Sequence, residues 1–208
     1  MEAIFSVKEA TEKLYTGLAE STGWKYLKSS QTLKKTVADL VFEINFHSSQ
    51  WNFSGQSVEV NADFYLKCKS YGKLDVNNVI ALISYRPDNG YWYDISTEEK
   101  FNQTFQELNN AIQNTAVNLC TQFENDYNAA VECLFREHFD EYRVSLDFIA
   151  DKLGISTIKA KAQEIYDGLS DEMKRQVSDY KNGIKNMPWM INRSNLKYIV
   201  DNNLIVNS

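Results

Sequence analysis

The chain has 208 residues, of which 43% are hydrophobic, 24% are charged and only two are prolines, so a disordered chain is excluded and one sizeable core is expected. The net charge of −6 argues against wrapping a nucleic acid, because a phosphate backbone requires a basic surface. Four lysines lie close together at positions 25, 28, 34 and 35, but we interpret them as a solvated strand edge and expect no nucleic-acid partner.

The first predicted element is a helix that begins after Ser6. Ser6 and Glu9 form a capping box, in which each side chain bonds a backbone N–H near the helix start. Leu14 and Leu18 recur at helical spacing, and Gly23 is placed to end the helix. Two short strands are predicted next, over residues 24–29 and 33–37, and we leave open whether the second runs straight into the strand that follows.

A long antiparallel hairpin is predicted from two alternating runs, residues 37–51 and 57–69, with the turn-prone residues Asn52, Ser54 and Gly55 between them. Side chains alternate across a strand, so each run has one apolar face and one polar face. The apolar positions are Leu40, Phe42, Ile44 and Phe46 in the first run and Val58, Val60, Ala62, Phe64, Leu66 and Cys68 in the second. We expect the rest of the chain to pack on this apolar face.

The next segments extend the sheet and then change to helical spacing. Residues 78–86 are β-rich and apolar on both sides, which predicts a buried strand, with a short helix as the alternative. The turn signal P-D-N-G at residues 87–90 predicts that residues 91–95 return as a strand. Ser96 and Glu99 indicate a second capping box and the start of a long helix. Its apolar stripe comprises Phe101, Phe105, Leu108, Ile112, Leu119 and Phe123.

The apolar spacing is helical from residue 126 to the end of the chain. We therefore predict an α+β fold, with an antiparallel sheet of about five strands packed by an N-terminal helix and a long helix. Residues 1–125 form this sheet domain, and residues 126–208 form a C-terminal helical extension packed on it within one folding unit.

Three cysteines are too few and too scattered for a disulfide framework. Cys68, Cys120 and Cys133 show no C-x-x-C spacing, and the first two lie on apolar stripes, so we expect small buried hydrophobes and no zinc ribbon. The first residues do not resemble a secretory signal, and no apolar run approaches the roughly 20 residues of a membrane span. We expect a cytoplasmic protein with no membrane partner, no cofactor and no bound metal.

The polar face of the predicted hairpin is the first candidate site. Antiparallel pairing is expected to bring Glu43 and Asn45 near Glu59 and Asn61, with further polar side chains beyond them. The candidate residues are Glu43, Asn45, His47, Glu59, Asn61 and Asp63. Their oxygen atoms could bind Mg²⁺ or Ca²⁺ or accept a basic partner, but an ordinary solvated sheet face is the interpretation that we favour.

Aromatic side chains form the second candidate site. Trp51 lies in the hairpin loop, and Tyr91, Trp92 and Tyr93 follow the predicted turn. Three neighbouring aromatics on a strand cannot all face one core, so at least one faces outward, where Trp and Tyr are favoured interface anchors. The alternative that we favour is that the C-terminal helices cover these residues.

Four short segments resemble the bacterial domain-of-unknown-function family numbered 4304. They read G-W-K-Y at residues 23–26, I-N-F-H-S-S at 44–49, V-N at 60–61 and W-Y-D-I at 92–95. Their order and spacing fit that family over roughly the first 125 residues, although His47 and Ser48 replace its usual Gln-Lys. The resemblance implies an α+β domain in a bacterial cytoplasm and brings no established activity.

The sequence offers few residues for acid–base catalysis. Only two histidines occur, His47 and His138, and no nucleophile-elbow, zincin, P-loop or dinucleotide-binding motif is present. We therefore expect a non-catalytic protein-interaction module with a protein partner, and by analogy alone an immunity or defence role. The alternative is a divalent-metal-dependent enzyme that acts on a phosphoester through the acidic hairpin face. The oligomeric state is left open.

Overall fold

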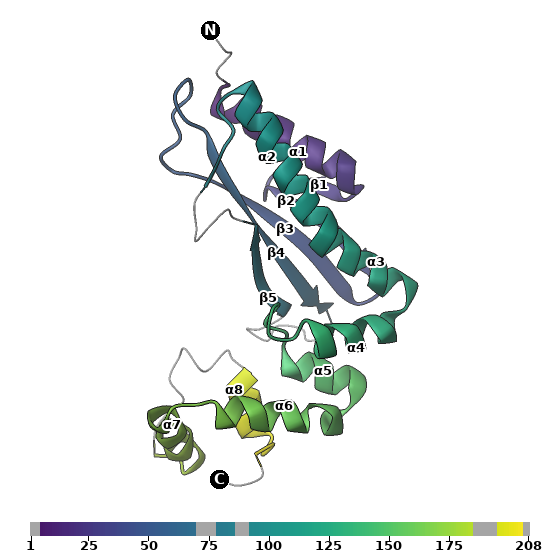
Figure 1. The fold of residues 1–208 in the computed structure, drawn as a ribbon, viewed down its shortest axis with the longest axis vertical. Helices are drawn as coiled ribbons and strands as arrows, with labels where there is room; N and C mark the ends of the chain where they lie inside the picture. Colours follow the sequence, from purple (N-terminus) through teal and green to yellow (C-terminus); the bar gives the residue numbers. More distant parts are fainter. Residues whose placement is uncertain (1–4, 70–77, 86–91, 185–194, 206–208) are drawn as a thin grey trace.

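The structure, a computed structural model, describes residues 5–69, 78–85, 92–184 and 195–205. It confirms the predicted α+β class: helices cover one face of an antiparallel sheet, and a helical extension continues beyond one end of it (Figure 1). The strands are β1 (Lys25–Leu27), β2 (Thr32–Val37), β3 (Leu40–Ser48), β4 (Glu59–Cys68), β5 (Asn78–Tyr85) and β6 (Tyr93–Asp94). Their order is β1-β2-β3-β4-β5, and β6 also pairs with β4.

A tight turn separates β2 from β3, which settles the question that the sequence left open. Val37 pairs with Leu40, so only Ala38 and Asp39 lie between the two strands. Ala38 has a φ of 51°, a left-handed conformation that two-residue hairpin turns require and that a residue with a Cβ atom rarely adopts. Because neither position is Gly or Asn, this turn has no strong signal in the sequence.

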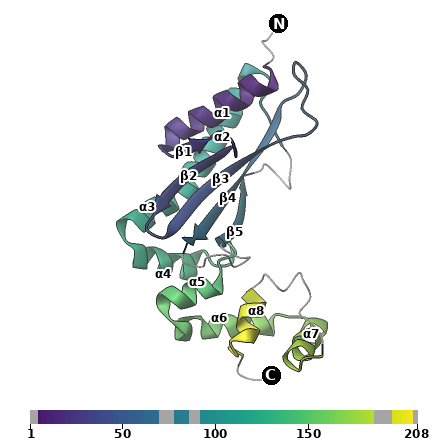
Figure 2. The same cartoon turned by 180° about the vertical axis from the view of Figure 1, so that it is seen from behind.

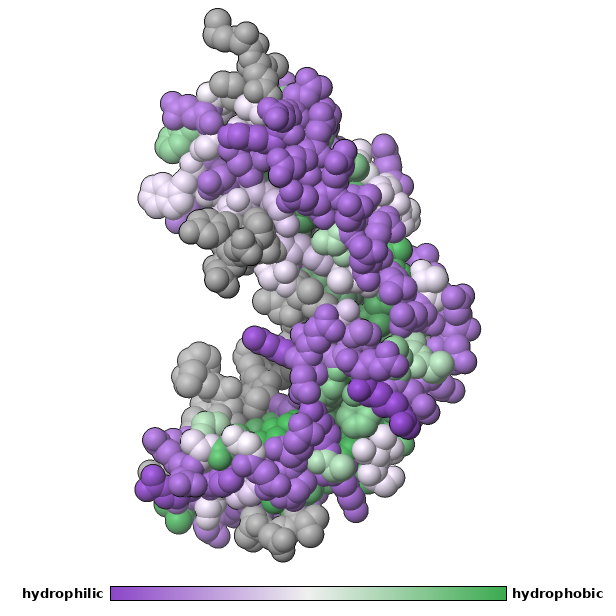
Figure 3. All heavy atoms as spheres, in the orientation of Figure 1, coloured by the Kyte–Doolittle hydropathy of each residue, from purple (hydrophilic) through white to green (hydrophobic). Residues whose placement is uncertain are grey.

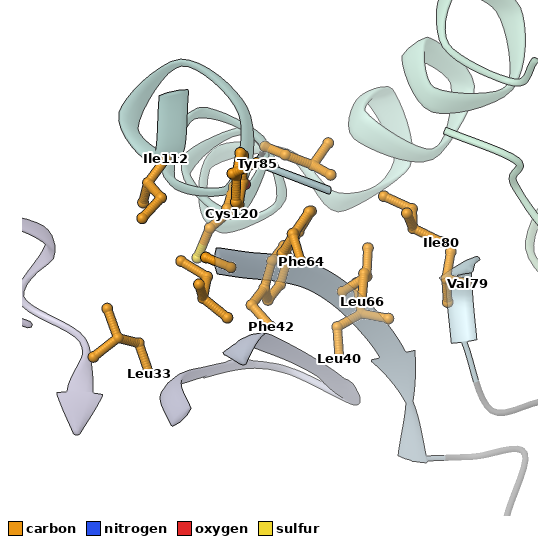
Figure 4. Close-up of a cluster of buried hydrophobic side chains, with 14 of the residues drawn as sticks. Leu33, Leu40, Phe42, Phe64, Leu66, Val79, Ile80, Tyr85, Ile112 and Cys120 are labelled. Atoms are coloured by element: carbon orange, nitrogen blue, oxygen red, sulfur yellow. The ribbon is translucent and has the colours of Figure 1, made fainter. Parts of the chain in front are cut away.

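The β3–β4 hairpin gathers its apolar side chains on one face, as the alternation predicts. Phe42 pairs with Leu66, so the two side chains share a face. The rings of Phe42 and Phe64 lie 6.3 Å apart, and both residues are fully buried. Figure 4 shows these side chains directed from the strands toward Ile112 and Cys120 of the helix layer.

Residues 78–85 form a strand, β5, and not the alternative helix. β5 lies at one edge of the sheet, and its pairing with β4 shifts register between Phe64 and Lys67. The predicted turn at residues 87–90 lies outside the described residues.

Helix α1 (Val7–Thr22) begins and ends where the sequence indicates. Ser6 and Glu9 form the capping box, and Gly23 follows the helix with a φ of 69°, the left-handed conformation that glycine adopts without strain. Leu14 and Leu18 are fully buried. Figure 2 shows α1 and the long helix on the same side of the sheet, behind the strands in that view.

The long helix consists of α2 (Glu98–Ile112), a π-helical turn η3 (Gln113–Val117) and α3 (Asn118–Asn125). Thr97 caps it by accepting a hydrogen bond from the Lys100 N–H, so the helix begins one residue later than the predicted Ser96 cap. The residues that it buries are Phe101, Thr104, Leu108, Ile112, Ala116, Leu119, Cys120 and Phe123. Its outward side is hydrophilic (Figure 3), as expected for one face of an amphipathic helix.

Phe105 departs from the predicted stripe. It is only half-buried and lies between the two helices, where a Cβ atom on Gly17 of α1 would come within 2.9 Å of its ring. Its ring stacks on Phe101, with ring centres 6.4 Å apart. The buried neighbour on this side of α2 is Thr104, whose hydroxyl donates to the Asp94 carbonyl.

The extension contains α4 (Tyr127–Glu137), α5 (Leu146–Leu153), α6 (Ile155–Asp167), α7 (Asp171–Lys181) and α8 (Asn195–Asp201). It attaches to the sheet at β5, where Val144 bridges to Ile80 and the Ser145 N–H donates to the Val79 carbonyl at 2.9 Å. One continuous core cluster runs from α1 through the strands to Ile199 of α8. The extension therefore shares the hydrophobic core of the sheet.

Asp39 connects the sheet to the extension through side-chain hydrogen bonds. Its carboxylate accepts from the Tyr127 hydroxyl at 2.8 Å, from Lys152 Nζ at 3.0 Å and from the Cys68 thiol at 3.2 Å. Burial raises the pKa of Tyr127, and the Asp39 carboxylate raises it further. Burial alone would lower the pKa of Lys152, but its bonds to Asp39 and Asp151 and the charge of Tyr127 together outweigh that effect, and the pKa is raised. The tight β2–β3 turn thus presents one carboxylate to both α4 and α5.

Candidate functional site

The polar face of the β3–β4 hairpin lies on the side of the sheet that no described helix covers (Figure 2). The observed register pairs Asn45 with Asp63 and His47 with Asn61. The expectation that Glu43 lies near Glu59 is wrong, because Glu43 pairs with Tyr65 and Glu59 lies beyond the end of β3. The sequence alone does not determine the strand register across a hairpin loop of ten residues. A shift in the position of the turn changes which residues of the two strands face each other.

Glu43 is neutralised by two lysines from the neighbouring strands. Its carboxylate accepts hydrogen bonds from Lys34 Nζ at 3.0 Å and Lys67 Nζ at 2.6 Å. Burial alone would raise the pKa of Glu43, but these two bonds outweigh burial and the pKa is lowered. Glu43 therefore stays ionised and already has its cationic partners.

Asp63 and His47 form a second pair on the same face. Asp63 is almost fully buried, and its Oδ2 lies 3.1 Å from His47 Nε2, while the His47 side chain is 47% exposed. Beside them, Asn45 accepts a hydrogen bond from the Thr32 hydroxyl at 2.9 Å. The polar face is thus a set of cross-strand pairs, the usual way in which a sheet satisfies polar side chains.

Asn61 and Glu59 complete the candidate set. Asn61 is almost fully buried, and its Oδ1 has no hydrogen-bond partner within the described parts of the chain. Glu59 is held through its backbone, since Asn52 bonds both its N–H and its carbonyl, at 2.7 and 2.9 Å. Among the residues described, no three histidine, cysteine or carboxylate ligands converge on this face. A metal-dependent phosphoester reaction would need several carboxylates around one metal ion. Here Glu43 is bonded to two lysines and Asp63 to His47, so the carboxylates do not share one site.

The hairpin end carries the exposed aromatics. Trp51 is 71% exposed, Phe53 61% and Trp92 36%. β6 pairs with the first two residues of β4, so Trp92 lies at the same end of the sheet as the hairpin loop. We call Trp51, Phe53 and Trp92 the aromatic end. Tyr91 lies outside the described residues.

The favoured prediction that the C-terminal helices cover these aromatics is wrong for Trp51. The extension attaches at the opposite end of the sheet from the hairpin loop (Figure 1), so its helices do not reach Trp51. Tyr93 does turn inward: it pairs with the buried Val60 and packs partly against the core. Burial raises its pKa, and the nearby Glu107 adds to the shift.

Hydrogen bonds brace the hairpin loop that carries two of these aromatics. Phe53 and Ser57 form an isolated β-bridge, with the Phe53 N–H 3.1 Å from the Ser57 carbonyl. The Ser54 hydroxyl accepts from the Val7 N–H at 3.3 Å, which ties the loop to the start of α1. A loop held in this way presents its aromatic side chains in a defined arrangement.

A groove between α1 and α2 is a feature that the sequence analysis missed. It has a volume of about 710 Å³ and a floor that includes Phe101, Phe105 and Gly17. Lys13 Nζ lies 4.5 Å from the centre of the Phe101 ring. The signal for this groove in the sequence is Gly17, in the middle of a predicted helix, because a glycine there allows a neighbouring helix or ring to approach closely.

Comparisons with protein-family models, with curated proteins and with solved structures find no match to this chain. The resemblance to the family numbered 4304 therefore stays a prediction. Within the described ranges, each helix is too short or too polar to cross a lipid bilayer.

Proposed function

We propose that the protein is a non-catalytic protein-interaction module that contacts a protein partner through its aromatic end. The observation that carries this proposal is the exposure of Trp51, Phe53 and Trp92 at one end of the sheet. Large exposed aromatics are costly to leave in water, and Trp is enriched among residues that dominate interface energies.

The loop geometry adds to this argument. A partner that binds a mobile loop must order it, which reduces the affinity gained from each contact. Here the bridge between Phe53 and Ser57 and the bond from Val7 to Ser54 already order the loop. The neighbouring polar face presents charges that are already paired, such as Glu43 with its two lysines. A partner can therefore bury the edge of the polar face without leaving the Glu43 carboxylate unpaired.

The test is photo-crosslinking in the native host. A photoreactive phenylalanine analogue replaces Phe53 in one chain and Ile184 in a control chain, because Ile184 is 65% exposed but lies in the extension. We expect a discrete crosslinked protein from position 53 and none from position 184. Adding Trp51→Ala to the first chain should lower its yield by about tenfold or more, as for a hot spot worth about 2 kcal/mol.

Equal crosslinking at the two positions, or a yield that Trp51→Ala leaves unchanged, would refute the proposal. An immunity or defence role is the narrower form of it, and a neighbouring toxin gene whose product is the crosslinked protein would support that form. We place the interaction in the cytoplasm, where the thiols of Cys120 and Cys133 stay reduced.

A further inference from the structure

The end of α4 brings together three side chains that can bind a metal ion. Cys133 Sγ, a Glu137 carboxylate oxygen and a ring nitrogen of His138 all lie within 4.8 Å of one another. Cys133 and Glu137 are four residues apart and so share one face of the helix. His138 is the C-cap residue, with φ −122° and ψ 7°, and its side chain leaves the helix beside them.

We propose that Cys133, Glu137 and His138 form a binding site for a transition-metal ion of the zinc class. Sulfur, imidazole nitrogen and carboxylate oxygen are the three donor types that Zn²⁺ takes in proteins, whereas Mg²⁺ and Ca²⁺ take oxygen almost alone. The position also suits a cation, because the last carbonyls of a helix carry a partial negative charge. This site is independent of the aromatic end, because α4 lies at the opposite end of the sheet from the hairpin loop (Figure 1).

The surroundings of His138 hold its ring in place. Its Nδ1 lies 2.9 Å from Glu141 Oε2, and its ring stacks on Tyr142 with ring centres 4.8 Å apart. A carboxylate bonded to the imidazole is the usual neighbour of a metal-binding histidine, where it fixes the ring orientation. Glu141 is thus assigned as a positioning residue, and three protein ligands leave one coordination position for water or for a fourth ligand.

Cobalt titration tests the site directly. Co²⁺ substitutes for Zn²⁺ in such sites, and its bond to a thiolate produces an intense near-ultraviolet absorption band. The chain supplies matched controls: Cys120→Ser removes a cysteine that lies elsewhere, and His47→Ala removes the other histidine. We expect the wild-type protein and both controls to bind one equivalent of Co²⁺, and Zn²⁺ to displace it.

Variants at the site test the role of each residue separately. Cys133→Ser should abolish the thiolate band, and His138→Ala should weaken Co²⁺ binding at least tenfold. Glu141→Gln should weaken binding about tenfold while the band persists, as for a residue that acts through the imidazole. Circular dichroism of each variant confirms that it folds. Absence of the band in the folded wild-type protein, or a band that survives Cys133→Ser or is lost in Cys120→Ser, would overturn the assignment.

Discussion

The carboxylate of Asp39 is predicted to be a main connection between the sheet and the extension. Asp39→Ala removes an acceptor for the Tyr127 hydroxyl and for Lys152 Nζ, which belong to α4 and α5. Each hydrogen bond to a charged group contributes about 1.5–3 kcal/mol when it is well buried. The Asp39 side chain is 26% exposed, so these values must be reduced for screening by solvent. We expect a loss of about 2–4 kcal/mol in the free energy of unfolding.

The matched control is Asp151→Ala. Asp151 contacts the same lysine at 3.3 Å, but its side chain is 52% exposed, so its ion pair is worth about 0.5 kcal/mol or less. Urea titration followed by circular dichroism gives the free energy of unfolding for both variants. Amide hydrogen exchange should show that Asp39→Ala exposes α4 and α5 more than it exposes β3.

Two results would refute this reasoning about the junction. One is an equal loss of stability in the Asp39 and Asp151 variants, which would make the buried bonds worth no more than a surface ion pair. The other is a loss of amide protection that is spread evenly over the sheet and the extension. Asp39→Asn, which keeps an acceptor oxygen but not the charge, should fall between Asp39→Ala and the wild-type protein.

Three further predictions concern the core, the polar face and the thiols. Phe42→Ala should cost about 3–5 kcal/mol in a urea titration, because the ring is fully buried, whereas the half-buried Phe105→Ala should cost roughly half as much. Glu43→Gln should cost about 1–2 kcal/mol at pH 7. The pKa of Glu43 is lowered in the folded protein, so the stability difference between the wild-type protein and Glu43→Gln has its full size above the pH range in which glutamates usually titrate. The difference disappears as the pH falls through the pKa of Glu43 in the folded protein. Urea titrations at several pH values can follow this loss. In the folded, metal-free protein an alkylating reagent should label Cys133 before Cys120, as mass spectrometry would show, because Cys120 is buried and burial raises its pKa to about 12. Equal costs for the two phenylalanines, a pH-independent effect at Glu43 or equal labelling would contradict these expectations.

The regular elements could be predicted because local patterns determine them. Alternation along β3 and β4 identifies the face that carries Phe42 and Phe64, since a one-residue slip would expose the whole apolar set. Ser6, Glu9 and Gly23 mark both ends of α1, because the first and last turns of a helix need these partners.

The candidate site depended on information that the sequence does not carry locally. Which residues of β3 and β4 stand opposite each other depends on the loop between them, so the pairing of Glu43 could not be read from alternation alone. Lys34 and Lys67 come from two different strands, and only the sheet order brings them to Glu43. The cluster at Cys133 could not be predicted from the sequence, because the spacing of Cys133, Glu137 and His138 does not match known metal-binding motifs. His138 joins the other two only because it lies at the C-cap of the helix.

The π-helical turn at Gln113–Val117 has a consequence for reading related sequences. Thr104, Leu108, Ile112, Ala116 and Cys120 are all buried at intervals of four residues. In an uninterrupted α-helix each step of four residues overshoots a full turn by about 40°, so such a series would rotate away from the sheet. The wider π turn takes up part of this rotation and returns the later residues toward the strands. A long run of small or apolar residues at strict period four is therefore a marker for an underwound segment, and relatives of this chain with an unbroken α-helix should show mixed steps of three and four instead.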